Sequence, residues 1–127
     1  MRAKNKKLIA AQKAENLVSS LLIQRGWVVL ARNFRGVGTE LDIVASKGDT
    51  LVAVEVKFRK CPFVLDLNSA QTLLSPRKKQ ALIRGVEMFI SKHQLTPLNI
   101  RIELALVRLN ANSRDLQVQY FVNAVFG

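Results

Sequence analysis

Three residues near the middle of the chain, Asp42, Glu55 and Lys57, have types and a spacing that suit acid–base or metal chemistry. Two carboxylates held side by side repel each other, so a shared proton, a cationic side chain or a bound divalent metal must offset the repulsion. Lys57 is the nearest candidate cation, because side chains two residues apart on a strand share a face. The alternative is a solvated hairpin end in which Lys57 pairs with Glu40.

The elements that position these residues are predicted to be two strands joined by a tight hairpin. Two runs rich in β-branched residues flank Gly48 and Asp49, a pair that favours a two-residue type II′ turn. With that turn, Asp42 lies opposite Glu55 on one face. The other face is predicted to be apolar and to carry Leu41, Ile43, Ala45, Val52, Val54 and Val56. A shift of one residue would mix charged and apolar side chains on both faces, which favours this register.

The hairpin residues resemble a known pattern. Asp42 followed by Glu55, Val56 and Lys57 resembles the D…(D/E)-x-K signature of the PD-(D/E)XK nucleases. Segments 38–44 and 54–59 resemble the YraN-like family of uncharacterised bacterial proteins, which is related to archaeal Holliday junction resolvases. The sequence departs from the pattern at Leu41, where the superfamily has its proline, and at Thr39, which interrupts an expected Gly-Glu pair. The resemblance spans nearly the whole chain.

This resemblance implies an α/β, restriction-endonuclease-like core in one domain over residues 1–127, a mixed β-sheet flanked by helices in the order α-β-β-β-α-β-β. It implies that Asp42, Glu55 and the Val56 carbonyl bind Mg²⁺ or Mn²⁺, and that Lys57 orients a water or neutralises phosphate charge. A glutamate on the first helix, matched by Glu15, points toward the cluster and holds a second metal or its water. The implied substrate is branched or structured nucleic acid, DNA in preference to RNA, and the implied assembly is a homodimer.

Composition bounds the remaining possibilities. The 127 residues include 20 Lys and Arg against nine Asp and Glu, which gives a net charge of +11, and 49% are hydrophobic. Such a chain is globular and attracts polyanions, with nucleic acid, ribosomes and anionic membrane surfaces as candidates. The chain has one Cys, so it cannot form an internal disulfide. With one Cys and one His, neither a zinc site nor a Ser-His catalytic site is expected. Because no stretch is long enough to span a bilayer, we expect a cytoplasmic protein without a membrane partner.

Two helices and several basic residues are expected around the hairpin. An amphipathic helix over residues 6–25 should end at Gly26 and place Glu15 at the edge of its apolar face. A second helix should start at Ser75 and Pro76 and run to His93. Bases crowd its first turn, where a bound anion would offset the unfavourable helix dipole. The candidate nucleic-acid-binding residues are Arg32, Arg35, Arg59, Lys60, Arg77, Lys78 and Lys79, of which Lys78 matches a lysine of the resembled family.

The remaining segments are predicted as strands and loops. A first strand is expected over residues 27–34 and merges into a flexible basic loop over 32–38. A long loop is expected over 60–74, and two further strands over 99–109 and 116–124. The rival interpretation of the whole is a basic nucleic-acid-binding or ribosome-associated module on a nuclease scaffold, whose acidic cluster is degenerate or structural.

Overall fold

The computed structural model describes residues 2–60, 66–110 and 112–125. Its elements follow the expected order with one additional short helix, α2. They are α1 (Arg2–Gln24), β1 (Val28–Gly36), β2 (Thr39–Lys47), β3 (Thr50–Lys60), α2 (Leu67–Gln71), α3 (Pro76–His93), β4 (Asn99–Leu109) and β5 (Leu116–Phe121).

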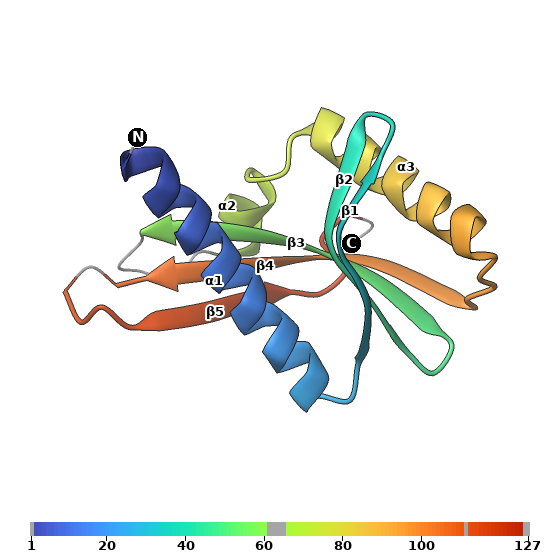
Figure 1. Cartoon of the computed structure of the whole chain (residues 1–127), viewed down its shortest axis with the longest axis horizontal. Helices are drawn as coiled ribbons and strands as arrows, with labels where there is room; N and C mark the ends of the chain where they lie inside the picture. The colour runs from blue at the N-terminus through green and yellow to red at the C-terminus, as the bar shows by residue number, and fades with distance from the viewer. Residues whose placement is uncertain (1, 61–65, 111, 126–127) are drawn as a thin grey trace.

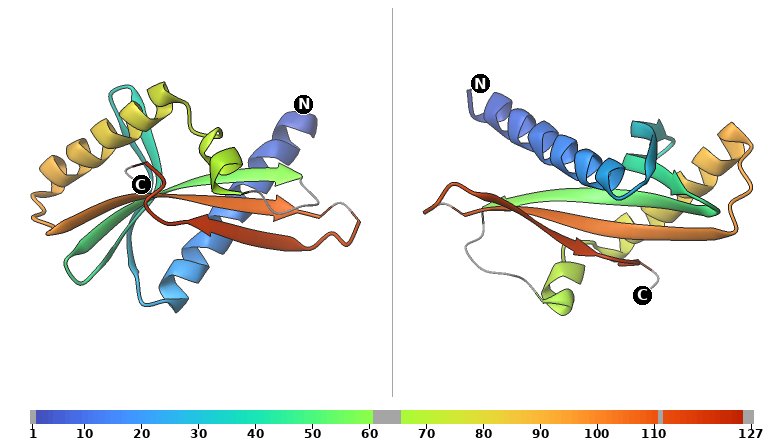
Figure 2. Two further views of the ribbon diagram at one scale, coloured as in Figure 1. Left: turned by 180° about the vertical axis from the view of Figure 1, so that it is seen from behind. Right: turned by 90° about the horizontal axis from the view of Figure 1, so that it is seen from below.

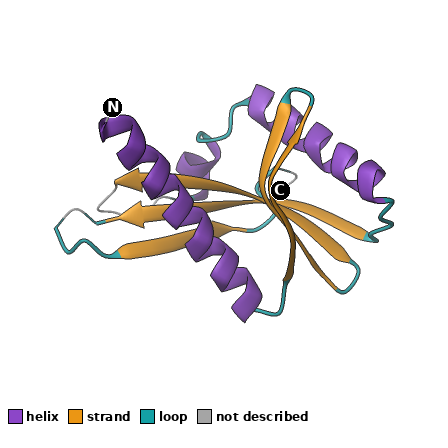
Figure 3. Ribbon diagram, viewed as in Figure 1, coloured by secondary structure: helices purple, strands orange, loops and turns teal. Residues whose placement is uncertain are grey.

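The five strands form one mixed sheet in the order β1-β2-β3-β4-β5 (Figure 1). β3 and β4 are parallel, and the other neighbouring pairs are antiparallel. Parallel neighbours need a crossover connection, and here α2 and α3 supply it. Helix α1 lies on one face of the sheet and α2 lies on the other, as the two turned views show (Figure 2). The expected mixed α/β sheet flanked by helices is therefore confirmed (Figure 3).

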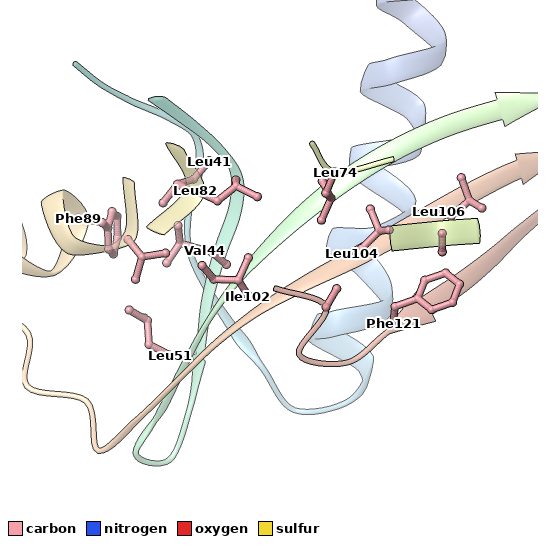
Figure 4. Close-up of a cluster of buried hydrophobic side chains, with 14 residues drawn as sticks. Leu41, Val44, Leu51, Leu74, Leu82, Phe89, Ile102, Leu104, Leu106 and Phe121 are labelled. Atoms are coloured by element: carbon pink, nitrogen blue, oxygen red, sulfur yellow. The ribbon is translucent and has the colours of Figure 1, made fainter. Parts of the chain in front are cut away.

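Two apolar clusters form the core, one on each face of the sheet. Successive side chains on a strand point to opposite faces, so Leu51 and Ala53 of β3 join α3 whereas Val52 and Val54 join α1. The α3 cluster also contains Leu41, Val44, Leu82, Phe89, Ile102 and Leu104 (Figure 4). Because helices cover both faces, the middle of the hairpin is buried on both sides, and the prediction of a single apolar face was wrong.

The hairpin register was predicted correctly. Ile43 pairs with Val54 and Ala45 with Val52, and Gly48 in the turn has a φ of +58°. The pairing of β2 with β3 ends at Ile43 and Val54, however, whereas β3 stays paired with β4 as far as Lys60. β2 then turns away from β3, which opens a fork in the sheet (Figure 1).

The expected loop over 32–38 is instead the end of β1 and a tight turn. β1 continues to Gly36, where it pairs with Thr39, and Gly38 in the turn has a φ of +69°. Phe34 holds this strand end against α3, with its ring centroid 5.1 Å from that of Phe89 in an edge-on arrangement. The prediction failed because this long-range packing does not show in the local sequence.

Two other segments differ from the predictions. The described part of the expected loop over 60–74 contains α2, which begins where the Asp66 carboxylate accepts a hydrogen bond from the Ser69 amide; residues 61–65 lie outside the described part. The last strand ends at Phe121 instead of residue 124, because Asn123 has a positive φ of 55° and donates its amide to Glu103.

Both long helices lie where they were predicted. α1 begins earlier than expected and ends at Gln24, followed by Gly26 with a φ of +89°. α3 starts as expected, with the Ser75 hydroxyl accepting a hydrogen bond from the Lys78 amide at 3.1 Å. In the described part of the chain, no helix combines the length and apolar character needed to cross a membrane.

Gly85 lets α3 approach β2 closely. A Cβ atom at this position would lie 2.6 Å from Thr39 Oγ1 and 2.9 Å from Leu41 Cδ2. We expect Gly85→Ala to lower the free energy of unfolding by about 1–3 kcal/mol in urea titrations, because both neighbours must move. Ser91→Ala, at an exposed position of the same helix, is the control. A stabilised Gly85→Ala protein, as helix propensity alone predicts, would contradict this packing.

Candidate active site

The candidate site lies in the fork between β2 and β3. Beyond the last paired residues, Asp42 Oδ2 accepts a hydrogen bond from the backbone amide of Val56 at 2.8 Å. β2 and β3 thus separate at the point where the chemically important side chains begin. A pocket of about 260 Å³ occupies the fork, and we call it the acid pocket. Its charged lining residues are Glu15, Glu40, Asp42, Glu55, Lys57 and Lys78.

Asp42 and Glu55, the acid pair, interact directly. Burial is the main cause that raises the pKa of Asp42, followed by a hydrogen bond to Glu55 and the charge of Glu55, and together they bring it to about 8. The bond from the Val56 amide acts in the opposite direction. The raised pKa favours the protonated form of Asp42 at neutral pH, beside a Glu55 side chain that is only 3% exposed. The two carboxyl groups meet as predicted, although their residues are not paired in the β2–β3 ladder.

Two lysines neutralise Glu55. Lys57 Nζ lies 3.7 Å from Glu55 Oε2, and Lys78 Nζ lies 3.0 Å from the same oxygen. Lys78 comes from the first turn of α3, so this helix start points one of its bases into the site. The alternative pairing of Lys57 with Glu40 is not observed in the described residues; Glu40 Oε1 instead lies 3.9 Å from Arg35 Nε.

Glu15 on α1 completes the acidic wall. Burial is the main cause that raises its pKa, and the nearby Arg32 charge lowers it in part. Arg32 Nη2 lies 3.6 Å from Glu15 Oε1. The charge of Glu15 also contributes to the raised pKa of Asp42, which places the two carboxyl groups within electrostatic reach. The helix edge that the sequence indicated for Glu15 therefore does face the acid pair.

The predicted nucleic-acid-binding residues fall into two groups. Lys78, Arg32 and Arg35 pair with acidic residues of the site. The others lie around it: Arg59 and Lys60 are exposed at the end of β3, Arg77 is exposed in the first turn of α3, and Lys79 beside it is half-buried.

Sequence reasoning missed three residues that line the acid pocket or the pocket beside it. Phe58 lines the acid pocket, and with Lys6 and Lys7 it also lines a second, larger pocket alongside. Alternation along β3 places Phe58 on the face of Val56 and away from Glu55, so the local pattern contained no signal that Phe58 lines this pocket. For Lys6 and Lys7 there was no signal, because only the packing of α1 on the sheet brings them near β3.

A second buried carboxylate, Glu103 on β4, shows that burial alone does not mark the site. It is 1% exposed and fully occupied by partners: Tyr120 Oη donates to it at 2.6 Å, the Asn123 amide donates at 3.1 Å, and Arg101 Nε lies 3.0 Å away. Burial and this contact with Glu103 also raise the pKa of Tyr120. Glu103 therefore links the end of β5 to β4 through these hydrogen bonds, whereas the acid pair lines a pocket.

The carboxyl oxygens of the acid pair are suitable ligands for a hard divalent cation. In the described ranges no group of three or more His, Cys, Asp and Glu side chains is arranged to hold a metal by itself. Two adjacent carboxyl groups are nevertheless a suitable oxygen set for Mg²⁺, which usually binds one or two carboxylates and keeps several waters. Burial and the charge of Glu55 raise the pKa of Asp42, so a positive charge is favoured beside this pair, and a bound metal would supply it.

The raised pKa of Asp42 predicts an unusual pH dependence in EDTA. The folded protein holds this proton up to about pH 8, whereas the unfolded chain releases it near the ordinary value of 3.8. Between these values the folded state binds more protons, so the free energy of unfolding should fall as pH rises, by at most about 1.4 kcal/mol per unit. Urea titrations of Asp42→Asn should show a weaker fall. If the free energy of unfolding of the two proteins falls equally steeply from pH 5 to 8, the raised pKa of Asp42 is contradicted.

The fold and the site together define a mixed α/β domain with a carboxylate–lysine pocket where two strands of its sheet diverge. The profile of the uncharacterised protein family UPF0102 matches residues 14–107, from within α1 to near the end of β4. The chain belongs to this family, also called YraN, which confirms the family resemblance.

Individual relatives agree over most of the chain. A UPF0102 protein of a Synechococcus species is 37% identical over 103 residues, which cover 80% of this chain and 76% of the relative. A UPF0102 protein of Dictyoglomus turgidum is 32% identical over 110 residues, which cover 87% of this chain and 91% of the relative. These names describe no activity, so a function must be argued from the site.

Proposed function

We propose that the protein is a metal-dependent phosphodiesterase that cuts nucleic acid. The observation that carries the proposal is the meeting of Asp42, Glu55 and Lys57 in one pocket, where burial and the neighbouring Glu55 raise the pKa of Asp42. Perturbed titratable groups that converge in a pocket are typical of catalytic sites. The arrangement is also the one that the PD-(D/E)XK resemblance implies.

Each residue of the site has a role in this proposal. Asp42, Glu55 and the Val56 carbonyl would hold Mg²⁺ or Mn²⁺, which when bound supplies an activated water and stabilises charge on the phosphate. Lys57 orients the attacking water or stabilises the charge that develops on the phosphate. Lys78 pairs with Glu55 and helps to fix the position of its carboxylate. Glu15 holds a further water, or the water of a second metal, at the other wall of the pocket.

One observation favours the rival, a binding module without catalysis. The ion pair of Lys78 with Glu55, at 3.0 Å, neutralises the buried carboxylate without any metal. In that case the acid pair is a structural cluster, and the net charge of +11 serves only to bind nucleic acid or ribosomes. A cleavage assay separates the two functions.

The proposed substrate is branched or structured nucleic acid, DNA in preference to RNA, and the proposed setting is a homodimer in the cytoplasm. The test is incubation of the purified protein with branched, duplex and single-stranded DNA and RNA in Mg²⁺, Mn²⁺ or EDTA. We expect cleavage of at least one substrate with either metal and none in EDTA. Binding of these substrates without cleavage in any condition would decide for the binding module.

Binding to duplex DNA should be largely electrostatic. We expect the logarithm of affinity to fall linearly with the logarithm of salt concentration, with a slope of about −0.9 for each phosphate neutralised. Arg77→Ala removes an exposed base at the start of α3 and should make this slope less steep by about 0.9, the contribution of one phosphate contact. Fluorescence anisotropy in EDTA measures both slopes. An affinity that does not change with salt would show that these bases are not the binding surface.

A further inference from the structure

A second pocket adjoins the acid pocket and is larger. It lies between the first half of α1 and the end of β3, and its volume is about 580 Å³. Small-molecule sites in proteins commonly measure about 300–1,000 Å³. The two pockets share Ala11, Val56, Lys57 and Phe58 as common walls. A molecule in the larger pocket would therefore lie beside the acid pocket.

The divergence of β2 from β3 and the small residues of α1 create this hollow. Beyond Val54, the described part of β3 is no longer paired with β2 as a strand, and the Val56 amide bonds to the Asp42 side chain instead. Besides Lys6 and Lys7, the α1 residues that line the pocket are Ala10 and Ala11, whose short side chains leave the space unfilled. The pocket is thus a consequence of the same fork that positions the acid pair.

The lining has a distinctive charge distribution. More apolar than polar surface faces the pocket, and no described residue that lines it is acidic. Its charged lining residues are all basic, namely Lys6, Lys7, Lys57, Arg59 and Lys60. An apolar interior with a basic rim complements a ligand that has a flat apolar body and attached negative charges, which describes a nucleotide.

We propose that this pocket, the nucleotide pocket, binds the base of one unpaired nucleotide next to the phosphate at the acid pair. Phe58 is the aromatic residue among the described residues that line it; it is half-buried against the core cluster under α1 and would supply the ring on which a base stacks. In a duplex both faces of each base are covered by neighbours, so a base enters only where it is unpaired and unstacked. The proposal rests on the proposed function and narrows its substrate to nucleic acid with an unpaired nucleotide at the cut.

The first test measures binding in EDTA, so it does not depend on cleavage. Anisotropy titrations compare a labelled single-stranded oligothymidine with a duplex that has no unpaired ends. Phe58→Ala should weaken binding of the single strand by about 5- to 100-fold, the loss expected for one stacked base. Binding of the duplex should change by less than about twofold, because phosphate contacts supply its affinity. Phe58→Leu keeps the apolar volume and should also weaken single-strand binding.

A matched pair of lysines on α1 tests the basic rim. Lys7→Ala removes a base that lines the nucleotide pocket, whereas Lys13→Ala removes an exposed base of the same helix outside both pockets. Lys7→Ala should weaken single-strand binding more than Lys13→Ala does. Equal effects of the two changes, or no effect of either change at Phe58 on the single strand, would overturn the proposal.

The second test uses the wild-type protein and so does not depend on a variant folding. Single-stranded DNA with one 5-iodouracil is irradiated with the protein, and the cross-linked peptide is identified by mass spectrometry. We expect the cross-link at Phe58; a cross-link only outside the residues of this pocket would overturn the proposal. If the protein cleaves DNA while Phe58 is neither cross-linked nor needed for binding, only the nucleotide pocket fails. If Phe58 is needed for single-strand binding but no substrate is cut, only the proposed hydrolysis fails.

Discussion

Replacing Glu55 with Gln should abolish metal binding and cleavage together. The change removes the charge of a carboxylate that is 3% exposed and lies at the centre of the site, where it contacts Asp42, Lys57 and Lys78. Calorimetry should show no Mn²⁺ binding to the site, and the cleavage rate should fall by about a thousandfold or more. Asp42→Asn should behave in the same way.

The control for this prediction is Asp49→Asn, at an exposed position in the turn of the same hairpin. It changes the net charge by the same amount without touching the acid pocket, so both metal binding and cleavage should persist. Far-ultraviolet circular dichroism checks that all variants fold. Unchanged Mn²⁺ binding in folded Glu55→Gln and Asp42→Asn proteins would refute the acid pair as the metal site.

Replacing Lys57 with Ala should separate binding from chemistry. The Lys57 side chain is 26% exposed and lies 3.7 Å from Glu55, so its loss leaves the carboxyl groups in place with Lys78 still beside them. We expect metal affinity to change little and DNA affinity to fall by no more than the loss of one charge contact explains, while the cleavage rate falls by about 10²- to 10³-fold, as when one transition-state donor is lost. Single-turnover rates at saturating DNA measure this effect.

The outcome for Lys57 also bears on the binding module. If Lys57 only neutralises Glu55, its removal should lower stability slightly, since a partly exposed pair contributes about 0–1 kcal/mol. Any cleavage would then continue at the wild-type rate. Lys13→Ala is the control, because Lys13 is exposed on α1 away from both pockets.

Local pattern was sufficient to predict the hairpin that carries the site. Alternating β-branched residues and the turn at Gly48 determine the pairing of Ile43 with Val54, and a shift would bury charge. The same pattern correctly predicted that the Asp42 and Glu55 side chains lie close to each other. The fork at their level could not be predicted from local pattern, because the diverging end of β2 packs against α3 at Gly85, which is distant in the sequence.

Other features were missed for related physical reasons. Lys78 was predicted as a phosphate ligand from its place in the first turn of α3, but the crossover from β3 to β4 carries that turn to Glu55. Arg32 and Arg35 were assigned to a loop because their segment contains glycines, whereas the pairing of β1 with β2 extends through both residues. In each case a tertiary contact determines where the side chain lies, and the local sequence contains no signal of that contact.

The most direct test of the central claim is a parallel cleavage assay of wild-type and Asp42→Asn proteins on the panel of branched, duplex and single-stranded nucleic acids in Mn²⁺. If the acid pair hydrolyses phosphodiester bonds, the wild-type protein forms products that EDTA prevents, and Asp42→Asn forms none although it still binds the substrate. Equal product formation by the two proteins, or tight binding of every substrate without any cleavage by the wild type, would contradict the claim.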